Sequence, residues 1–216
     1  MVWLLVEAGV PLVVAAPAGR LVAARQLLAG VLRSIRPDPD EASAAIAELD
    51  RPGAWQLWHG DRRGAVVDAG SLGDLRNRLA APPFRLSRQE LTFLGCVLVL
   101  APPEDRPTGR LRVVAAHYVR PLARDAHGHA QELPPAVLST WDARLDRYEH
   151  FAWGVVPEIA ARLGRRSGDV EADLHHRRDD LAGLAAAGLS SIEEVRRLIA
   201  GYRMAYGRPH GDNRST

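Results

Sequence analysis

The sequence contains no lysine, so all 28 of its Lys and Arg residues are arginine. This absence excludes a lysine Schiff base, a catalytic lysine base and the phosphate-binding lysine of a P-loop. The single cysteine, Cys96, excludes an internal disulfide framework and any multi-cysteine metal site. No apolar run reaches the roughly 18 residues that a membrane-spanning helix needs. No signal peptide is recognisable either, so we expect a cytoplasmic protein.

The remaining composition is that of an ordinary globular chain. Its 216 residues are 47% hydrophobic and 25% charged, which indicates one domain with a real core. The abundance of Ala, Gly, Pro and Arg is typical of a GC-rich genome. A net charge of +2 is too small to indicate a nucleic-acid partner by itself.

The first hundred residues alternate between apolar strands and helices. Pro11 to Ala16 is apolar at every position and bounded by turn residues, which predicts a fully buried strand. A turn at 17–20 and a helix at 21–34 follow, as in the opening of a βα unit. We also predict a helical turn at 3–8, a linker at 36–40, a helix at 41–49, strands at 54–59, 64–67 and 96–100, a helix at 72–80 capped by Ser71, and a capping box of Ser87 with Glu90.

After a loop at 102–109 the pattern becomes rich in strands and then helical. We predict a strand at 110–120 and hairpin strands at 138–141 and 147–151. Helices are predicted at 155–163, 170–187 and 191–206, the last opened by a capping box of Ser191 with Glu194. The polar tail at 207–216 is predicted to be disordered.

The order strand, turn, helix at 12–32 invites a test for a phosphate-binding loop. Such a loop needs glycines whose N–H groups face phosphate, a lysine for the β- and γ-phosphates, and a hydroxyl for Mg²⁺. Here Ala16 and Leu21 stand at the two glycine positions, Val22 at the lysine position and Ala23 at the hydroxyl position. Only Gly19 remains of the motif.

Several segments nevertheless resemble one family. The run Leu4–Ala15 resembles the segment before the P-loop in secretion and pilus ATPases of the type II/type IV traffic superfamily. Ala65–Leu72 resembles the histidine box of these enzymes, with Asp68 where the histidine would be and Ser71 near its end. Weaker similarity continues over 75–100, 111–120 and 140–142.

The resemblance implies a P-loop NTPase-like α/β fold whose catalytic signatures are lost. The vestigial nucleotide-binding loop would be Pro17, Ala18, Gly19 and Arg20, with Asp68 and Ser71 at the histidine-box position. Arg20 could contact an anion or be a solvated surface residue, and Asp68 would repel phosphate or cap the following helix. The stretch 50–64 is short for a Walker B segment, and Asp61 is the nearby acid.

Other groups of polar residues have simpler interpretations. Acids and histidines at helical spacing could share a metal ion, although a solvated helix face is the alternative: Asp173, His175, His176, Asp179 and Asp180. His127 and His129 fit a turn, His117 a core or edge position, and Cys96 a buried packing position. Arg177, Arg178, Arg196, Arg197 and Arg203 would give the last two helices a basic surface.

We therefore expect an α/β fold with a three-layer core, a partly parallel sheet, a strand-rich middle and a C-terminal helical hairpin. The expected divisions are an α/β domain at 1–151, a helical segment at 152–206 and a tail at 207–216. The resemblance favours a non-catalytic protein that binds a protein partner or forms homo-oligomers, with no cofactor. ATP and Mg²⁺ enter only in the alternative, a divergent ATPase that contacts phosphate through Arg20. An arginine-rich nucleic-acid-binding protein is the second alternative, which the sparse aromatic residues disfavour.

Overall fold

A computed structural model describes residues 1–36, 46–61, 64–102, 109, 111–124, 127 and 129–206. The fold is mixed α/β, built on a seven-stranded sheet in the order β2-β3-β1-β4-β5-β8-β9. The strands of this sheet are β1 (Leu12–Ala16), β2 (Ile46–Glu48), β3 (Gly64–Asp68), β4 (Cys96–Ala101), β5 (Arg112–Tyr118), β8 (Ala136–Asp142) and β9 (Arg147–His150). A separate two-stranded ribbon is formed by β6 (Ala123–Arg124) and β7 (Ala130–Gln131).

The sheet has a parallel half and an antiparallel half. β2, β3, β1 and β4 are parallel neighbours, whereas β5, β8 and β9 each run antiparallel to the strand before them. β1 and β3 are apolar and buried along almost their whole length, as expected for parallel strands covered on both faces. The chain leaves β1 toward β2 and leaves β4 toward β5, so the carboxyl ends of β1 and β4 form a topological switch point.

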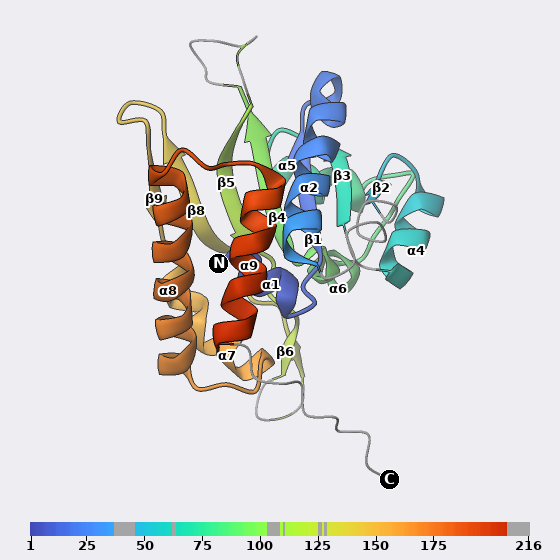
Figure 1. Ribbon diagram of the computed structural model, residues 1–216. Helices are drawn as coiled ribbons and strands as arrows, with labels where there is room; N and C mark the ends of the chain where they lie inside the picture. The colour runs from blue at the N-terminus through green and yellow to red at the C-terminus, as the bar shows by residue number, and fades with distance from the viewer. Residues whose placement is uncertain are drawn as a thin grey trace.

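Helices cover both faces of the parallel half and give the three layers. The connecting and covering helices are α1 (Val2–Glu7), α2 (Leu21–Ile35), α4 (Pro52–Asp61), α5 (Leu72–Ala80), α6 (Arg88–Leu91), α7 (Val156–Arg162), α8 (Ser167–Ala186) and α9 (Ile192–Tyr206). Short 3₁₀ turns are η1 (Ala18–Arg20), η2 (Thr92–Leu94) and η3 (Ala152–Val155). Figure 1 shows α1, α2 and α9 in front of the sheet, with α8 at the end that carries β8 and β9.

Two apolar clusters fill the spaces between the layers. On one face, α1, α2 and the C-terminal helices pack on the sheet, so that Ile159, Val170 and Ile199 belong to the same core as Leu12 and Val14. On the other face, α4 and α5 pack against Val13 and Val97. Burying apolar side chains on both faces supplies the main favourable term in folding.

Most predicted elements appear where the residue pattern placed them. The strands at 11–16, 64–67 and 96–100 and the helices at 21–34, 72–80 and 191–206 are confirmed within one or two residues. Ser71 accepts a hydrogen bond from Asp74 N, which confirms it as the N-cap of α5. The capping boxes of Ser87 with Glu90 and of Ser191 with Glu194 are both formed.

Two of the predicted secondary-structure elements are wrong. The strand predicted at 54–59 is the helix α4, in which Trp55 and Trp58 lie three residues apart and are both buried while Leu57 is exposed. The helix predicted at 41–49 is replaced at its end by the strand β2, where Ile46 pairs with Gly64. Most of the predicted linker at 36–40, most of the loop at 102–109 and the tail at 207–216 lie outside the described residues.

Candidate functional site

The carboxyl edge of the parallel strands is where α/β proteins place ligands. Here the turn from β1 into α2 is four residues long, from Pro17 to Arg20. Arg20 N donates to Pro17 O at 2.7 Å, which closes the turn, and α2 begins at the next residue. Its four residues match the spacing between the two glycines of the motif, so the residue types, and not the length of the turn, depart from a phosphate-binding loop.

Gly19 does not use the conformational freedom that glycine has. Its φ is not positive, and a Cβ added at Gly19 would meet nothing within 4 Å. A phosphate-binding loop uses glycine for left-handed backbone or for close approach of the ligand. Beyond the turn, Val22 is 75% exposed, so the position that would hold a lysine carries an apolar residue in solvent.

Asp68 lies beside this turn, at the end of β3. It is the Cα partner of Ala16, and Ala69 N donates to Ala16 O at 3.1 Å, so the two strand ends are held together. The Asp68 carboxylate accepts from Arg78 Nη1 at 2.8 Å, and the same guanidinium donates to the Asp68 carbonyl oxygen at 3.1 Å. Arg78 on α5 therefore reaches back and neutralises the carboxylate.

The expectation that Asp68 caps the following helix is wrong. Ser71 caps α5, and the Asp74 carboxylate accepts from Gly70 N at 2.9 Å, so the capping bonds at this helix start are made by residues other than Asp68. The ion pair of Asp68 with Arg78 is half-exposed, and such pairs contribute only about 0–1 kcal/mol. Arg78 was missed by sequence reasoning because a contact between residues ten apart on a strand and a helix leaves no local pattern.

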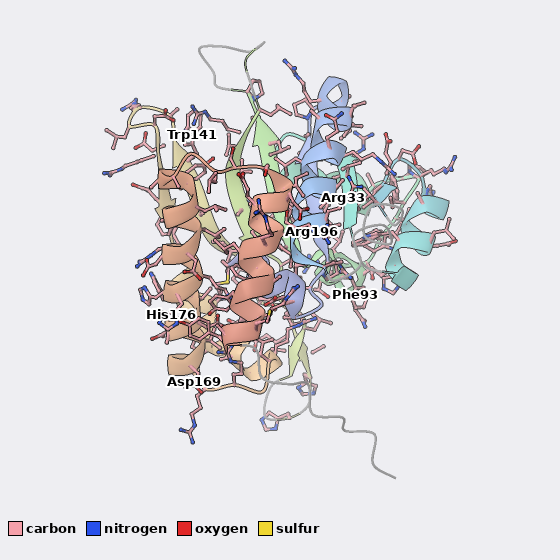
Figure 2. All side chains as sticks on the ribbon, in the orientation of Figure 1. Arg33, Phe93, Trp141, Asp169, His176 and Arg196 are labelled. Carbon is pink, nitrogen blue, oxygen red and sulfur yellow. The ribbon has the colours of Figure 1, made fainter. Side chains whose placement is uncertain are left out.

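The predicted acid-and-histidine cluster on α8 is dispersed. His175 stacks on Trp153 with ring centroids 5.0 Å apart, and His176 (Figure 2) stacks on Tyr206 at 5.4 Å. Asp179 pairs with Arg178 at 2.7 Å. Among the described residues, no three His, Cys, Asp or Glu side chains come together as a metal site.

Asp173 and Arg177 are not a solvated helix face, which corrects the simpler interpretation. Both are 8% exposed. Arg177 Nε donates to Asp173 Oδ1 at 2.6 Å, and its Nη1 donates to Glu7 Oε2 on α1 at 2.6 Å. Tyr202 donates its hydroxyl to Asp173 Oδ1 at 2.5 Å.

The polar partners of this buried cluster set its ionisation. Burial opposes the charged form of Asp173, but hydrogen bonds from Arg177, Tyr202 and Arg165 outweigh it, so the pKa of Asp173 is lowered. The Arg177 guanidinium also lies over the Trp3 ring, 4.3 Å from its centroid. The cluster therefore joins α1, α8 and α9 as a fully paired unit.

The basic surface predicted on the last two helices is reduced by these pairings. Arg177 is buried, and Arg203 donates to Glu7 Oε1 at 2.9 Å and to the carbonyl of Ile35. Arg196 lies 3.7 Å from Glu193. Two of the five arginines thus hold the fold together, and a nucleic-acid interface built on all five is not present.

The other residues singled out in the sequence are Cys96, His117, the pair His127 and His129, and Asp61. Cys96 is fully buried, and burial raises the pKa of its thiol to about 12. His117 is half-buried on β5, and burial lowers its pKa. His127 and His129 lie with ring centroids 6.2 Å apart, while Gly128 between them is outside the described residues. The side chain of Asp61, at the end of α4, also lies outside them.

Two hollows lie away from the carboxyl edge. A groove of about 330 Å³ between α4 and residues 84–93 is lined by Trp55, His59, Phe84 and Phe93, the last labelled in Figure 2. A second, of about 310 Å³, lies at the amino ends of β1 and β4, beside Gly95 and Tyr118. Neither includes the turn at 17–20.

Comparison with protein-family models found no match, and comparison with curated proteins found none. The resemblance to secretion ATPases accordingly stays a prediction from the residues. Within the described part of the chain, no helix is long and apolar enough to cross a membrane.

Proposed function

We propose that this chain is a degenerate P-loop-like relative of the secretion and pilus ATPases, which acts by contact with other proteins and not by hydrolysing nucleotide. The observation that carries the proposal is the chemistry of the turn at 17–20 and of the helix start behind it. Gly19 has no positive φ, and the exposed Val22 stands where a phosphate-binding loop places its lysine.

The chemistry of the surrounding residues supports the same conclusion. Phosphoryl transfer depends on positioning and on stabilising phosphate charge with Mg²⁺ and a cation. The chain contains no lysine, Ala23 offers no hydroxyl to a metal ion, and the Asp68 carboxylate is paired with Arg78. A site lacking these three devices has little to offer a transferring phosphate.

One observation favours the alternative, nucleotide binding through Arg20. Arg20 is the N-cap of α2 and makes no side-chain capping hydrogen bond to the helix. Helix N-termini attract anions, and arginine matches phosphate geometry. This alternative requires a phosphate to dock against the turn without the lysine and without the two glycines of the motif.

Equilibrium dialysis of radiolabelled ATP with Mg²⁺, followed by a hydrolysis assay on the same samples, separates the two. The proposal predicts no retained nucleotide and no release of phosphate above a protein-free control. Retention that is lost in Arg20→Ala and kept in Arg25→Ala would contradict it. Arg25 is a suitable control because it is an exposed arginine on the same helix.

A further inference from the structure

The strand β9 ends the sheet with an unused edge. Phe151 N donates to Leu138 O, so in the alternating antiparallel ladder Arg147 and Glu149 also point their backbone groups toward β8. The N–H and C=O groups of Tyr148 and His150 therefore point away from β8. Among the described residues β8 is the strand that pairs with β9, and nothing pairs with its outer side.

Exposed large apolar side chains gather around this edge. They come from the turn before β9, from β9 itself and from the residues that lead on into η3, and Figure 1 shows β9 and α8 together at one end of the molecule. Leu145, Tyr148, Phe151 and Trp153 are each at least 43% exposed. Exposed apolar side chains that cluster on a surface mark interaction sites. At the opposite edge, α4 packs beside the short strand β2.

We propose that β9 pairs antiparallel with β9 of a second copy of this chain, around a two-fold axis at Tyr148. In that register the outward N–H and C=O of Tyr148 bond to those of the partner copy. Arg147 then lies directly opposite Glu149 of the other copy, and the symmetry forms this ion pair twice. Shifting the pairing so that Glu149 lies on the axis would set two carboxylates against each other.

Charged, short edge strands normally prevent sheets from joining. This strand differs because Arg147 and Glu149 have opposite signs, are two residues apart and so share one face of the strand. Self-pairing matches the charges instead of opposing them. The strand alone supplies few hydrogen bonds, so the apolar side chains around it must contribute, and we expect a reversible dimer.

The inference rests on the proposed function, because it names a second copy of the chain as a partner of a protein that acts by binding other proteins. Its test is independent of nucleotide. If the protein is monomeric, the dimer proposal is overturned and the proposed function stands. If the protein binds nucleotide, the proposed function is overturned and the dimer proposal stands.

Sedimentation equilibrium over a concentration series up to the millimolar range tests the dimer. The wild-type chain should dimerise, and Arg147→Glu should weaken dimerisation about tenfold or more because it creates two like-charge pairs. The double variant Arg147→Glu/Glu149→Arg restores complementarity and should restore the dimer. A monomeric wild type, or a double variant no better than the single one, would overturn the proposal.

A second arm keeps the test valid if Arg147→Glu disturbs the hairpin, where Arg147 lies opposite Asp142. Tyr148→Cys would bring two cysteines to the axis at a Cα separation of about 5.5 Å, within disulfide range. Mild oxidation should then give a covalent dimer faster than in Met204→Cys, whose position is 89% exposed on α9. Equal rates of covalent dimer formation in the two cysteine variants would overturn the proposed pairing of β9 around Tyr148. Cys96 does not interfere because it is buried.

Discussion

Arg177 on α8 donates a hydrogen bond from Nη1 to Oε2 of Glu7 on α1 at 2.6 Å, joining residues 170 apart in the sequence. The same guanidinium binds Asp173 and lies over Trp3 and Tyr202. This contact ties the first helix to the last two and closes one face of the sheet.

We predict that Arg177→Ala lowers the free energy of unfolding by about 3–5 kcal/mol, because it leaves the buried Asp173 carboxylate without its main partner. Urea unfolding followed by circular dichroism measures the change. The matched control is Arg178→Ala, at an exposed pair with Asp179, which should cost less than about 1 kcal/mol. Equal losses in the two variants would contradict the assigned role of Arg177.

The lowered pKa of Asp173 has a consequence for acid stability. A carboxylate whose folded-state pKa lies below its unfolded value stabilises the fold above the unfolded pKa, here 3.8. That contribution is lost as the pH falls through the folded pKa. Thermal midpoints measured from pH 6 to pH 2 (about the range of carboxyl titration) should therefore fall less steeply in Asp173→Asn than in the wild type. Parallel curves would show that the carboxylate is not preferentially stabilised.

Gly95 is required by its backbone geometry. Its φ is +66°, and a Cβ there would lie 2.8 Å from the carbonyl oxygen of Pro11. That same oxygen accepts the Cys96 N–H that starts the pairing of β4 with β1. We expect Gly95→Ala to destabilise the protein by more than about 1 kcal/mol.

Gly201 offers a matched control for this substitution. It lies inside α9, and a Cβ added there would meet nothing within 4 Å. Gly201→Ala should therefore stabilise the protein, by about 0.5–1 kcal/mol. Thermal midpoints that move in the same direction for both variants would refute the distinction.

Cys96 should be unreactive in the folded protein. Burial raises the pKa of its thiol to about 12, so almost no thiolate is present at neutral pH. Labelling with a thiol-specific chromogenic reagent should be slow in buffer and rapid in denaturant. Fast labelling without denaturant would place Cys96 in an accessible site.

The parallel half of the fold is predictable from sequence because its strands are apolar on both faces and its helices α5 and α6 have local caps. Ser71 and Ser87 each mark these helix starts by a hydrogen bond over three residues, as Ser191 does for α9. The stretch 54–59 misled the prediction because two tryptophans favour strands by propensity. In the structure they share one buried helix face.

The site is less predictable because its decisive contacts are not local. In the sequence Asp68 has no recognisable partner, whereas in the structure Arg78 of the next helix donates a hydrogen bond to its carboxylate. The sequence predicts a solvated helix face at Asp173 and Arg177, because no nearby residue indicates that Arg177 contacts Glu7 and Trp3. By contrast, the loss of the P-loop motif is evident from Val22 and Ala23 alone.

The central claim is that the turn at 17–20 no longer holds phosphate, and a thermal-shift titration with ATP, ADP and Mg²⁺ tests it most directly. A ligand at about 100 times its Kd would stabilise the protein by roughly 2.7 kcal/mol, a shift of a few degrees. We predict no shift at millimolar nucleotide. A clear shift that disappears in Arg20→Ala would contradict the claim and show that the turn still binds phosphate.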